Sequence, residues 1–299
     1  MTTDGLGPRV DAPPHVASLK ARIRNETPNE VEATRLERTV ALVALGQMLL
    51  ACEVNGNSPG QVAAAIKGGT AMRIRYGPSN SRFSRDLDTA RATDLDTFVS
   101  LFGTALAQGW GGFSGEVRPS RSVSRPLGVP EQYVMVAYEV KLRYGSVGLS
   151  KSLMTVPLEI GADELDDTQD PLRVIDPQVV ALFSRLGLPE PQPLPVIADA
   201  HQIAQKLHAV SAHGSERAHD LIDLQLLARD TDAPDADIAL TCVRLFAFRR
   251  QHLWPPLIEV GADWESLYAA QLGSLDVLPN VAAAVQWANE YVQRLAAAR

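Results

Sequence analysis

The spacing of apolar residues divides the chain into an N-terminal helical part, a mixed middle part and a helical C-terminal part. Residues 16–53 begin with a charged stretch and continue as LERTVALVALGQMLLA, whose dense apolar positions predict a packed helix. Residues 94–108 predict an amphipathic helix with Thr93 or Asp94 as its cap. From Ile197 onward helices are predicted over 197–212, 216–229, 235–252, 262–272 and 277–298, with a break at 254–256.

Strand patterns lie between these helical parts. The segments YVMVAYEVKLRYG and VGLSKSLMTVPLEIGA are rich in β-branched and aromatic residues and predict two strands joined by a turn near Gly145. Residues 109–130 predict irregular or edge-strand structure, and prolines punctuate 171–195 around one short helix candidate, PQVVALFSRLG. We therefore expect a helical lead-in over 1–60, an α/β core over 61–170, a proline-rich connection over 171–196 and a C-terminal helical domain over 197–299.

The stretch KGGTAMRIRYGPSNSRFSRDLD, residues 67–88, holds the first candidate chemistry. The apolar run 63–66 predicts a buried strand or helix end that stops at Gly68-Gly69. Two glycines let the backbone approach a ligand closely, and a helix beginning at Thr70 points its free N–H groups at the same place, where an anion can bind. Arg82 and Arg85 add forked donors that suit phosphate.

Asp86, Leu87 and Asp88 predict a strand that presents two carboxylates. Residues i and i+2 of a strand share a face, so both carboxylates point one way and Leu87 points into the core. Two neighbouring carboxylates repel each other unless a positive group lies between them, and a hard divalent cation is the usual solution. A phosphate-binding turn followed by paired carboxylates indicates metal-assisted nucleotidyl transfer.

A second set of charged residues lies in the C-terminal helices. In ERAHDLIDLQLL the apolar residues surround Asp223 on nearly every side, which predicts a buried helix. A buried carboxylate without a partner is costly, so we expect a cation nearby. Lys206, at the edge of the apolar stripe of the preceding helix, meets Asp223 if the two helices form a hairpin.

Composition narrows the function classes. The net charge of −7 argues against a protein that coats nucleic acid nonspecifically, although residues 67–151 carry twelve Lys and Arg against seven Asp and Glu. The two cysteines lie far apart, which fits a reduced cytoplasmic protein. The sequence has neither a long apolar run nor a signal pattern, so no membrane association is expected.

The pattern KGGT…RFSRDLD resembles the signature of AbiEii/AbiGii-type nucleotidyltransferases, which belong to the DNA polymerase beta-like superfamily and are often toxins of two-gene toxin–antitoxin systems. AbiEii-type and mycobacterial MenT-type enzymes also carry a helical Lys and a downstream Asp, matched here by Lys206 and Asp223. The resemblance extends from Ile66 to about Leu227. It implies an α/β (α+β) fold, with a mixed-sheet nucleotidyltransferase core and a C-terminal helical domain.

The resemblance also implies roles for individual residues. Asp86, Asp88 and Glu159, the last as a third carboxylate from a neighbouring strand, bind Mg²⁺ or Mn²⁺, and Glu159 is alternatively the base. Lys206 contacts nucleotide phosphates and Asp223 holds it in place. The implied partners are an NTP, the 3′ end of tRNA and a cognate antitoxin. The expected nucleotide-binding residues are Lys67, Gly68, Gly69, Thr70, Arg82, Ser84 and Arg85.

Three alternatives stay open from the sequence. A protein nucleotidyltransferase has the same site but labels a Ser, Thr or Tyr hydroxyl. His219-Asp220 resembles the centre of HD-type metal phosphohydrolases, which require further His and Asp ligands. A non-catalytic binding module keeps the fold and tolerates loss of the carboxylates. The sequence lacks the motifs of zinc proteases, P-loop NTPases and serine hydrolases.

Overall fold

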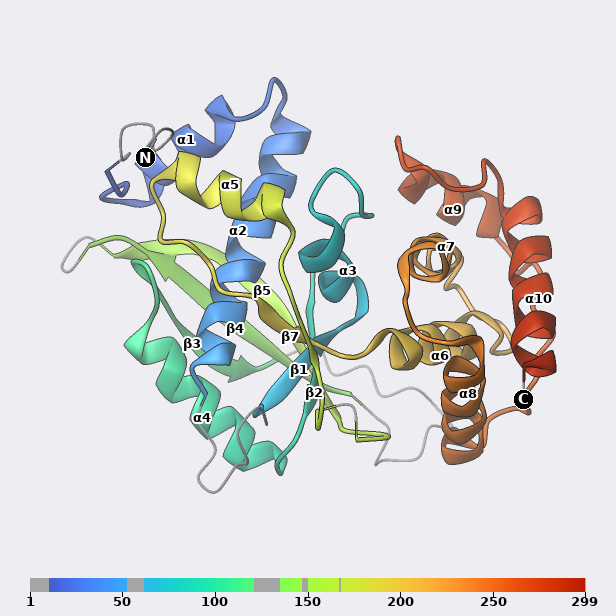
Figure 1. Cartoon of the computed structure of the whole chain (residues 1–299). Helices are drawn as coiled ribbons and strands as arrows, with labels where there is room; N and C mark the ends of the chain where they lie inside the picture. The colour runs from blue at the N-terminus through green and yellow to red at the C-terminus, as the bar shows by residue number, and fades with distance from the viewer. Residues whose placement is uncertain (1–10, 53–61, 121–134, 147–149, 167, 299) are drawn as a thin grey trace, which may run out of the picture.

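A computed structural model describes residues 11–52, 62–120, 135–146, 150–166 and 168–298. Its N-terminal two-thirds is built on one seven-stranded mixed sheet with the strand order β3-β4-β5-β2-β1-β7-β6 (Figure 1). The strands are β1 Ala64–Lys67, β2 Leu87–Arg91, β3 Phe113–Pro119, β4 Val136–Tyr144, β5 Lys151–Ala162, β6 Leu172–Val174 and β7 Leu194–Val196.

The long antiparallel pair β4 and β5 confirms the two predicted strands, and it extends the sheet that carries the paired carboxylates. β5 lies parallel to β2, and β2 lies antiparallel to β1. β3 is the edge strand, as predicted for the described part of 109–130. Part of the predicted turn near Gly145 lies outside the described residues, as do residues 121–130.

Four helices cover the sheet and build the larger core. They are α1 Val16–Asn25, α2 Glu30–Leu50, α4 Leu95–Gln108 and α5 Pro177–Leu186. The predicted helix over 16–53 is thus two helices, and the predicted cap Asp94 accepts a hydrogen bond from the Thr97 backbone N–H at 2.9 Å. Side chains from these helices and from the strands form one hydrophobic cluster that runs from Leu19 to Val196.

All five predicted C-terminal helices are present and surround a second hydrophobic cluster (Figure 1). They are α6 Asp199–Val210, α7 Asp220–Asp230, α8 Asp235–Arg249, α9 Trp264–Leu272 and α10 Val281–Ala297. Among the described residues, no helix is long and apolar enough to cross a membrane. We refer to the two hydrophobic clusters with their elements as the sheet lobe and the helical lobe.

Helix α3, Gly68–Tyr76, lies between the two lobes (Figure 1). Ala71 and Ile74 belong to the core of the sheet lobe, whereas Met72 belongs to the core of the helical lobe. Arg75 forms a bidentate ion pair with Asp199 at the start of α6. Helix α3, which begins with the Gly-Gly pair, therefore connects the two lobes on both sides of the candidate site.

The structure shifts three expected features. α3 begins at Gly68 rather than Thr70, so the glycines form its first turn, and β2 begins at Leu87, directly after Asp86. Residues 171–196, expected as a connection, contribute β6, α5 and β7 to the sheet lobe, and β7 pairs with β1 through Ile66 and Val196. The four-part domain division stays a proposal, with 171–196 packed against the core.

Candidate active site

Three charged side chains lie next to one another across the centre of the sheet. Lys67 at the end of β1 is the register partner of Asp88 in β2, and Asp88 is the register partner of Glu159 in β5. Asp86 directly precedes β2, and Leu87 is fully buried in the core. The predicted alternation is confirmed, because Asp86 and Asp88 line the same cleft while Leu87 points away from it.

Burial and mutual repulsion disturb the titration of this group. Burial, with a further contribution from Glu159, raises the pKa of Asp88 to about 6. Burial and the charge of Asp86 likewise raise the pKa of Glu159. Burial lowers the pKa of the Lys67 ammonium, against the opposing effects of Glu164 and Asp88. Unfavourable crowding of carboxylates is typical of a site that receives a cation or a proton in its working state.

The Gly-Gly pair is required by close contacts on both of its residues. Gly68 has a φ of +64°, and a Cβ atom there would lie 1.9 Å from Asp88 Oδ2. A Cβ atom on Gly69 would lie 2.9 Å from Ser84 Oγ. Thr70 is fully buried, and its hydroxyl donates to the backbone carbonyl of Asp86. The turn therefore holds the carboxylate loop in place, in addition to any contact with a ligand.

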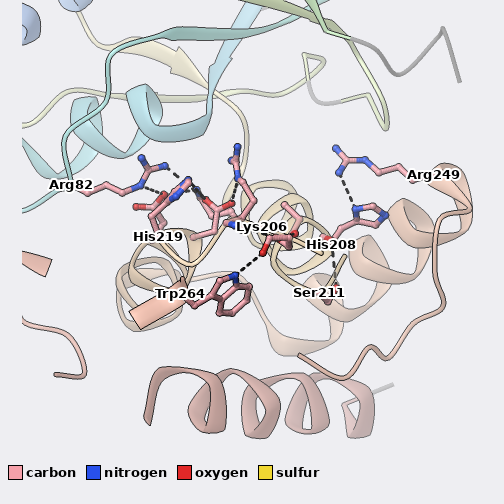
Figure 2. Close-up of polar contacts among 12 residues, drawn as sticks. Arg82, Lys206, His208, Ser211, His219, Arg249 and Trp264 are labelled. Carbon is pink, nitrogen blue, oxygen red and sulfur yellow. Dashed lines mark hydrogen bonds and ion pairs between the residues drawn. The ribbon is translucent and has the colours of Figure 1, made fainter. Parts of the chain in front are cut away.

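The helical lobe supplies the opposite charge. Lys206 Nζ on α6 lies 2.5 Å from Asp223 Oδ2 on α7, which confirms the predicted pair between the two helices (Figure 2). Arg82 reaches across from the sheet lobe, and its Nε donates to the same Asp223 oxygen at 2.9 Å. Asp223 is fully buried and does not line the cleft, so it acts on the site through these two cations.

Asp220 and Arg217 also belong to this network, to which the sequence reasoning did not assign them. Asp220 is fully buried and accepts from Lys206 Nζ at 2.9 Å and from Arg217 Nε at 2.8 Å. Burial alone would raise the pKa of Asp220, but Lys206 and Arg217 hold it well below its usual range. A usable signal was present in the sequence, because Asp220 and Asp223 are three residues apart and share a helix face.

The HD-type alternative finds no support in this geometry. His219 Nε2 lies 4.0 Å from Asp220 Oδ1, and both oxygens of Asp220 are occupied by Lys206 and Arg217. Burial lowers the pKa of His219 to about 4, so its ring is neutral near pH 7. Lys206 and Arg217 already neutralise Asp220, so their positive charges would repel a metal ion bound there.

A cleft of about 530 Å³ lies between the two lobes. Its sheet-lobe wall carries the carboxylates, and its helical-lobe wall carries Lys206, Arg217 and Arg249. Of the predicted site residues, Thr70 and Asp223 lie behind the surface of the cleft. The others line it: Lys67, Gly68, Gly69, Arg82, Ser84, Arg85, Asp86, Asp88, Glu159 and Lys206.

An ion pair between the lobes lies at another part of the cleft. Arg249 of α8 donates from Nε and Nη2 to the two carboxylate oxygens of Glu164 at 2.9 and 2.7 Å. Its Nη1 lies 3.3 Å from His208 Nδ1 (Figure 2). Since Glu164 follows β5, this pair joins the strand of Glu159 to the helical lobe.

The donor set suits a hard cation that arrives with its ligand. No group of three or more His, Cys, Asp and Glu side chains within the described ranges is arranged to hold a metal ion by itself. Mg²⁺ usually keeps several waters and binds one or two carboxylates together with substrate phosphates. Asp86 and Asp88, which line one wall of the cleft, fit that mode of binding.

Comparison with known proteins places this site in a family. The sequence model described as nucleotidyl transferase AbiEii toxin, type IV toxin–antitoxin system, matches residues 50–296. The chain belongs to this family. It is a nucleotidyltransferase toxin of a type IV toxin–antitoxin system, and membership implies an NTP substrate and an antitoxin partner. No curated protein shows significant sequence similarity to this AbiEii chain.

A solved structure supports the predicted fold of this AbiEii nucleotidyltransferase. MenT4, a nucleotidyltransferase toxin from Mycobacterium tuberculosis H37Rv, matches with a TM-score of 0.50 and 20% sequence identity. The alignment covers 99% of this chain and 100% of MenT4. At this identity the match shows a shared fold, and the predicted mixed-sheet α/β core with a helical C-terminal part is confirmed.

Proposed function

We propose that this AbiEii enzyme transfers nucleotides from an NTP to the 3′ end of tRNA, which blocks aminoacylation and translation. The observation that carries the proposal is the pair of oppositely charged walls: Asp86, Asp88 and Glu159 face Lys206 and Arg217 across one cleft. The first wall suits the cation of a metal–triphosphate and the second suits its phosphates. We place this action in the cytoplasm, where NTPs and tRNA meet.

The reaction forms a bond between the acceptor 3′ oxygen and the α-phosphorus and breaks the bond from that phosphorus to the bridging oxygen of pyrophosphate. Asp86 and Asp88, with Glu159, would hold Mg²⁺ or Mn²⁺, which when bound neutralises phosphate charge and aligns the reacting groups. Glu159 is alternatively the acceptor of the hydroxyl proton, since its raised pKa brings it nearer to neutral pH.

The helical lobe steadies the phosphates during this transfer. Lys206 presents its ammonium to the leaving pyrophosphate while Asp220 and Asp223 fix its position. Arg217 is half exposed and lines the cleft, and because Asp220 accepts from its Nε, the Nη groups would bind phosphate. Gly68 and Gly69 at the start of α3, with Lys67, Arg82, Ser84 and Arg85, complete the proposed nucleotide contacts. Thr70, also expected among them, lies behind the cleft surface and supports the loop of Asp86.

One labelling experiment tests the proposal. The protein is incubated with each radiolabelled NTP, Mg²⁺, total tRNA and cell lysate, beside Asp86→Ala and the control Asp96→Ala, an exposed aspartate of α4. Label on tRNA that is lost in Asp86→Ala and kept in Asp96→Ala supports the proposal. Label only on protein favours transfer to a Ser, Thr or Tyr hydroxyl, and label that survives Asp86→Ala overturns the metal assignment.

A further inference from the structure

A cluster of arginines surrounds Phe83, which lines the cleft. The guanidinium carbons of Arg73, Arg85 and Arg35 lie 5.6, 5.8 and 6.0 Å from the centre of the Phe83 ring. An aromatic face attracts cations at these distances. The ring therefore gathers three like charges from three segments of the chain at one side of the cleft.

Only some of these arginines have structural partners that account for them. Arg73 is 1% exposed and donates to Thr39 Oγ1 at 3.0 Å and to the Arg82 backbone carbonyl at 3.1 Å. Arg35 is partly exposed and pairs with Glu32 at 3.2 Å on the surface of the same helix, a type of pair worth little. Arg85 is exposed.

A fourth arginine joins this cluster from the same helix as Arg35. Arg38 donates from Nη1 to the Thr155 backbone carbonyl of β5 at 3.3 Å. Arg38 lies three residues after Arg35, so the two side chains share one face of α2. Arg35, Arg38 and Arg85 thus form a basic rim beside Asp86, on the sheet-lobe side of the cleft.

Two of the three rim arginines lie outside the residues that match the family model. Arg35 and Arg38 lie in α2, ahead of the residues 50–296 that match the family model. Carboxylates in the described residues neutralise these two arginines only in part. Arg38 donates to a carbonyl, and its neighbour Glu37 pairs with Lys20. Arg35 pairs with Glu32 at the surface. Clustered guanidinium groups with few counter-ions form a site for an extended polyanion.

The direction of the reaction indicates which polyanion. The attacking and leaving oxygens of phosphoryl transfer lie roughly in line on opposite sides of the phosphorus. Lys206 and Arg217, which suit the leaving pyrophosphate, stand on the helical-lobe wall. The acceptor must then arrive from the other side of the phosphorus. We propose that Arg35 and Arg38 of the basic rim bind the phosphate backbone of the RNA acceptor strand and guide its 3′ end past Arg85 to Asp86.

This inference rests on the proposed function and is tested by Arg35→Gln/Arg38→Gln. Its control is Arg118→Gln/Arg143→Gln, which removes the same charge from exposed arginines of β3 and β4 outside the cleft. Binding of tRNA is measured by fluorescence anisotropy over a range of salt, and binding of a fluorescent NTP analogue with Mg²⁺ is measured alongside. Circular dichroism and melting temperature verify that both variants fold.

We expect the α2 variant to lose about tenfold in tRNA affinity and about one to two units of the logarithmic salt slope, since each phosphate contact contributes about 0.7–0.9. Its NTP affinity stays at the wild-type value. The inference is wrong if the α2 variant binds tRNA like the control, or if it loses NTP affinity while tRNA affinity holds. If the wild-type protein transfers no nucleotide to tRNA, the proposed function is wrong. This outcome differs from a loss of the α2 effect on tRNA binding, so failure of the inference and failure of the proposed function can be told apart.

Discussion

Gly68→Ala offers a sharp test of how the Gly-Gly turn serves the carboxylates. The added methyl group would lie 1.9 Å from Asp88 Oδ2, and Gly68 has a φ of +64°. Gly214 is a matched control, because its φ is +67° and no atom lies within 4 Å of the Cβ position. Both substitutions impose the same backbone strain, so the difference between them isolates the contact with Asp88.

The magnitudes follow from these two terms. A left-handed alanine costs about 1–2 kcal/mol, which both variants share. Overpacking at Asp88 adds about 1–3 kcal/mol to Gly68→Ala alone. The melting temperature falls by about 2–4 °C per kcal/mol in a chain of this size class. A displacement of the Asp88 carboxylate by about 1 Å should also lower the transfer rate by about 10²-fold.

Differential scanning fluorimetry and the initial rate of nucleotide transfer measure the two effects. We expect Gly214→Ala to lose a few degrees of melting temperature and to keep its transfer rate per folded molecule. Gly68→Ala should lose more in both measurements. Equal melting temperatures and equal rates for the two variants would refute the argument that Asp88 is positioned against the Gly-Gly turn.

Three further predictions follow from the charges of the site. Lys206→Met removes a cation from two buried carboxylates and should lower the free energy of unfolding by about 3–5 kcal/mol, measured by urea titration. The double variant Lys206→Met/Asp223→Asn should recover part of that loss, and no recovery would show that the two residues are not coupled. Burial lowers the pKa of His208 to about 3. As the pH falls below about 6.5, His208 therefore becomes protonated in the unfolded chain and stays neutral in the folded chain. The contribution of His208 alone should therefore lower the stability by about 1.3 kcal/mol between pH 7 and pH 5.5. His208→Asn should lack this contribution, and an identical pH dependence in both proteins would contradict it. Mg²⁺ should raise the melting temperature only together with an NTP, because the described residues hold no preformed metal site, and EDTA should abolish transfer; a rise with Mg²⁺ alone would show that the carboxylates suffice.

What the sequence predicts well in this protein is set by local periodicity. The alternation of Asp86, Leu87 and Asp88 depends only on the two-residue repeat of a strand, and the buried surroundings of Asp223 depend only on the helical repeat. Both predictions are confirmed. β6 and β7 were missed because each is only three residues long, too short for a repeat to stand out, and β7 contains Pro195.

The parts of the site that the sequence does not reveal depend on contacts between distant segments. Arg82 meets Asp223 over a separation of 141 residues, through a loop whose conformation no periodic pattern determines. Asp220 was interpreted together with its neighbour His219, although in a helix the neighbours that share a face are three or four residues away. Its partners are therefore Lys206 and Arg217, and not the adjacent histidine.

The charges of the completed cleft explain why both lobes are needed for one site. On the helical-lobe side, Lys206, Arg82 and Arg217 meet Asp220 and Asp223, which leaves an excess of positive charge. At the centre of the sheet, the single ammonium of Lys67 lies beside the carboxylates of Asp88 and Glu159, with Asp86 next to them on the same wall, so negative charge prevails there. A metal–triphosphate has the complementary order, with its cation toward the sheet and its phosphates toward the helices. Either lobe alone would bind only one of these charges, so the α3 contacts that fix the lobes are as necessary to the chemistry as the carboxylates themselves.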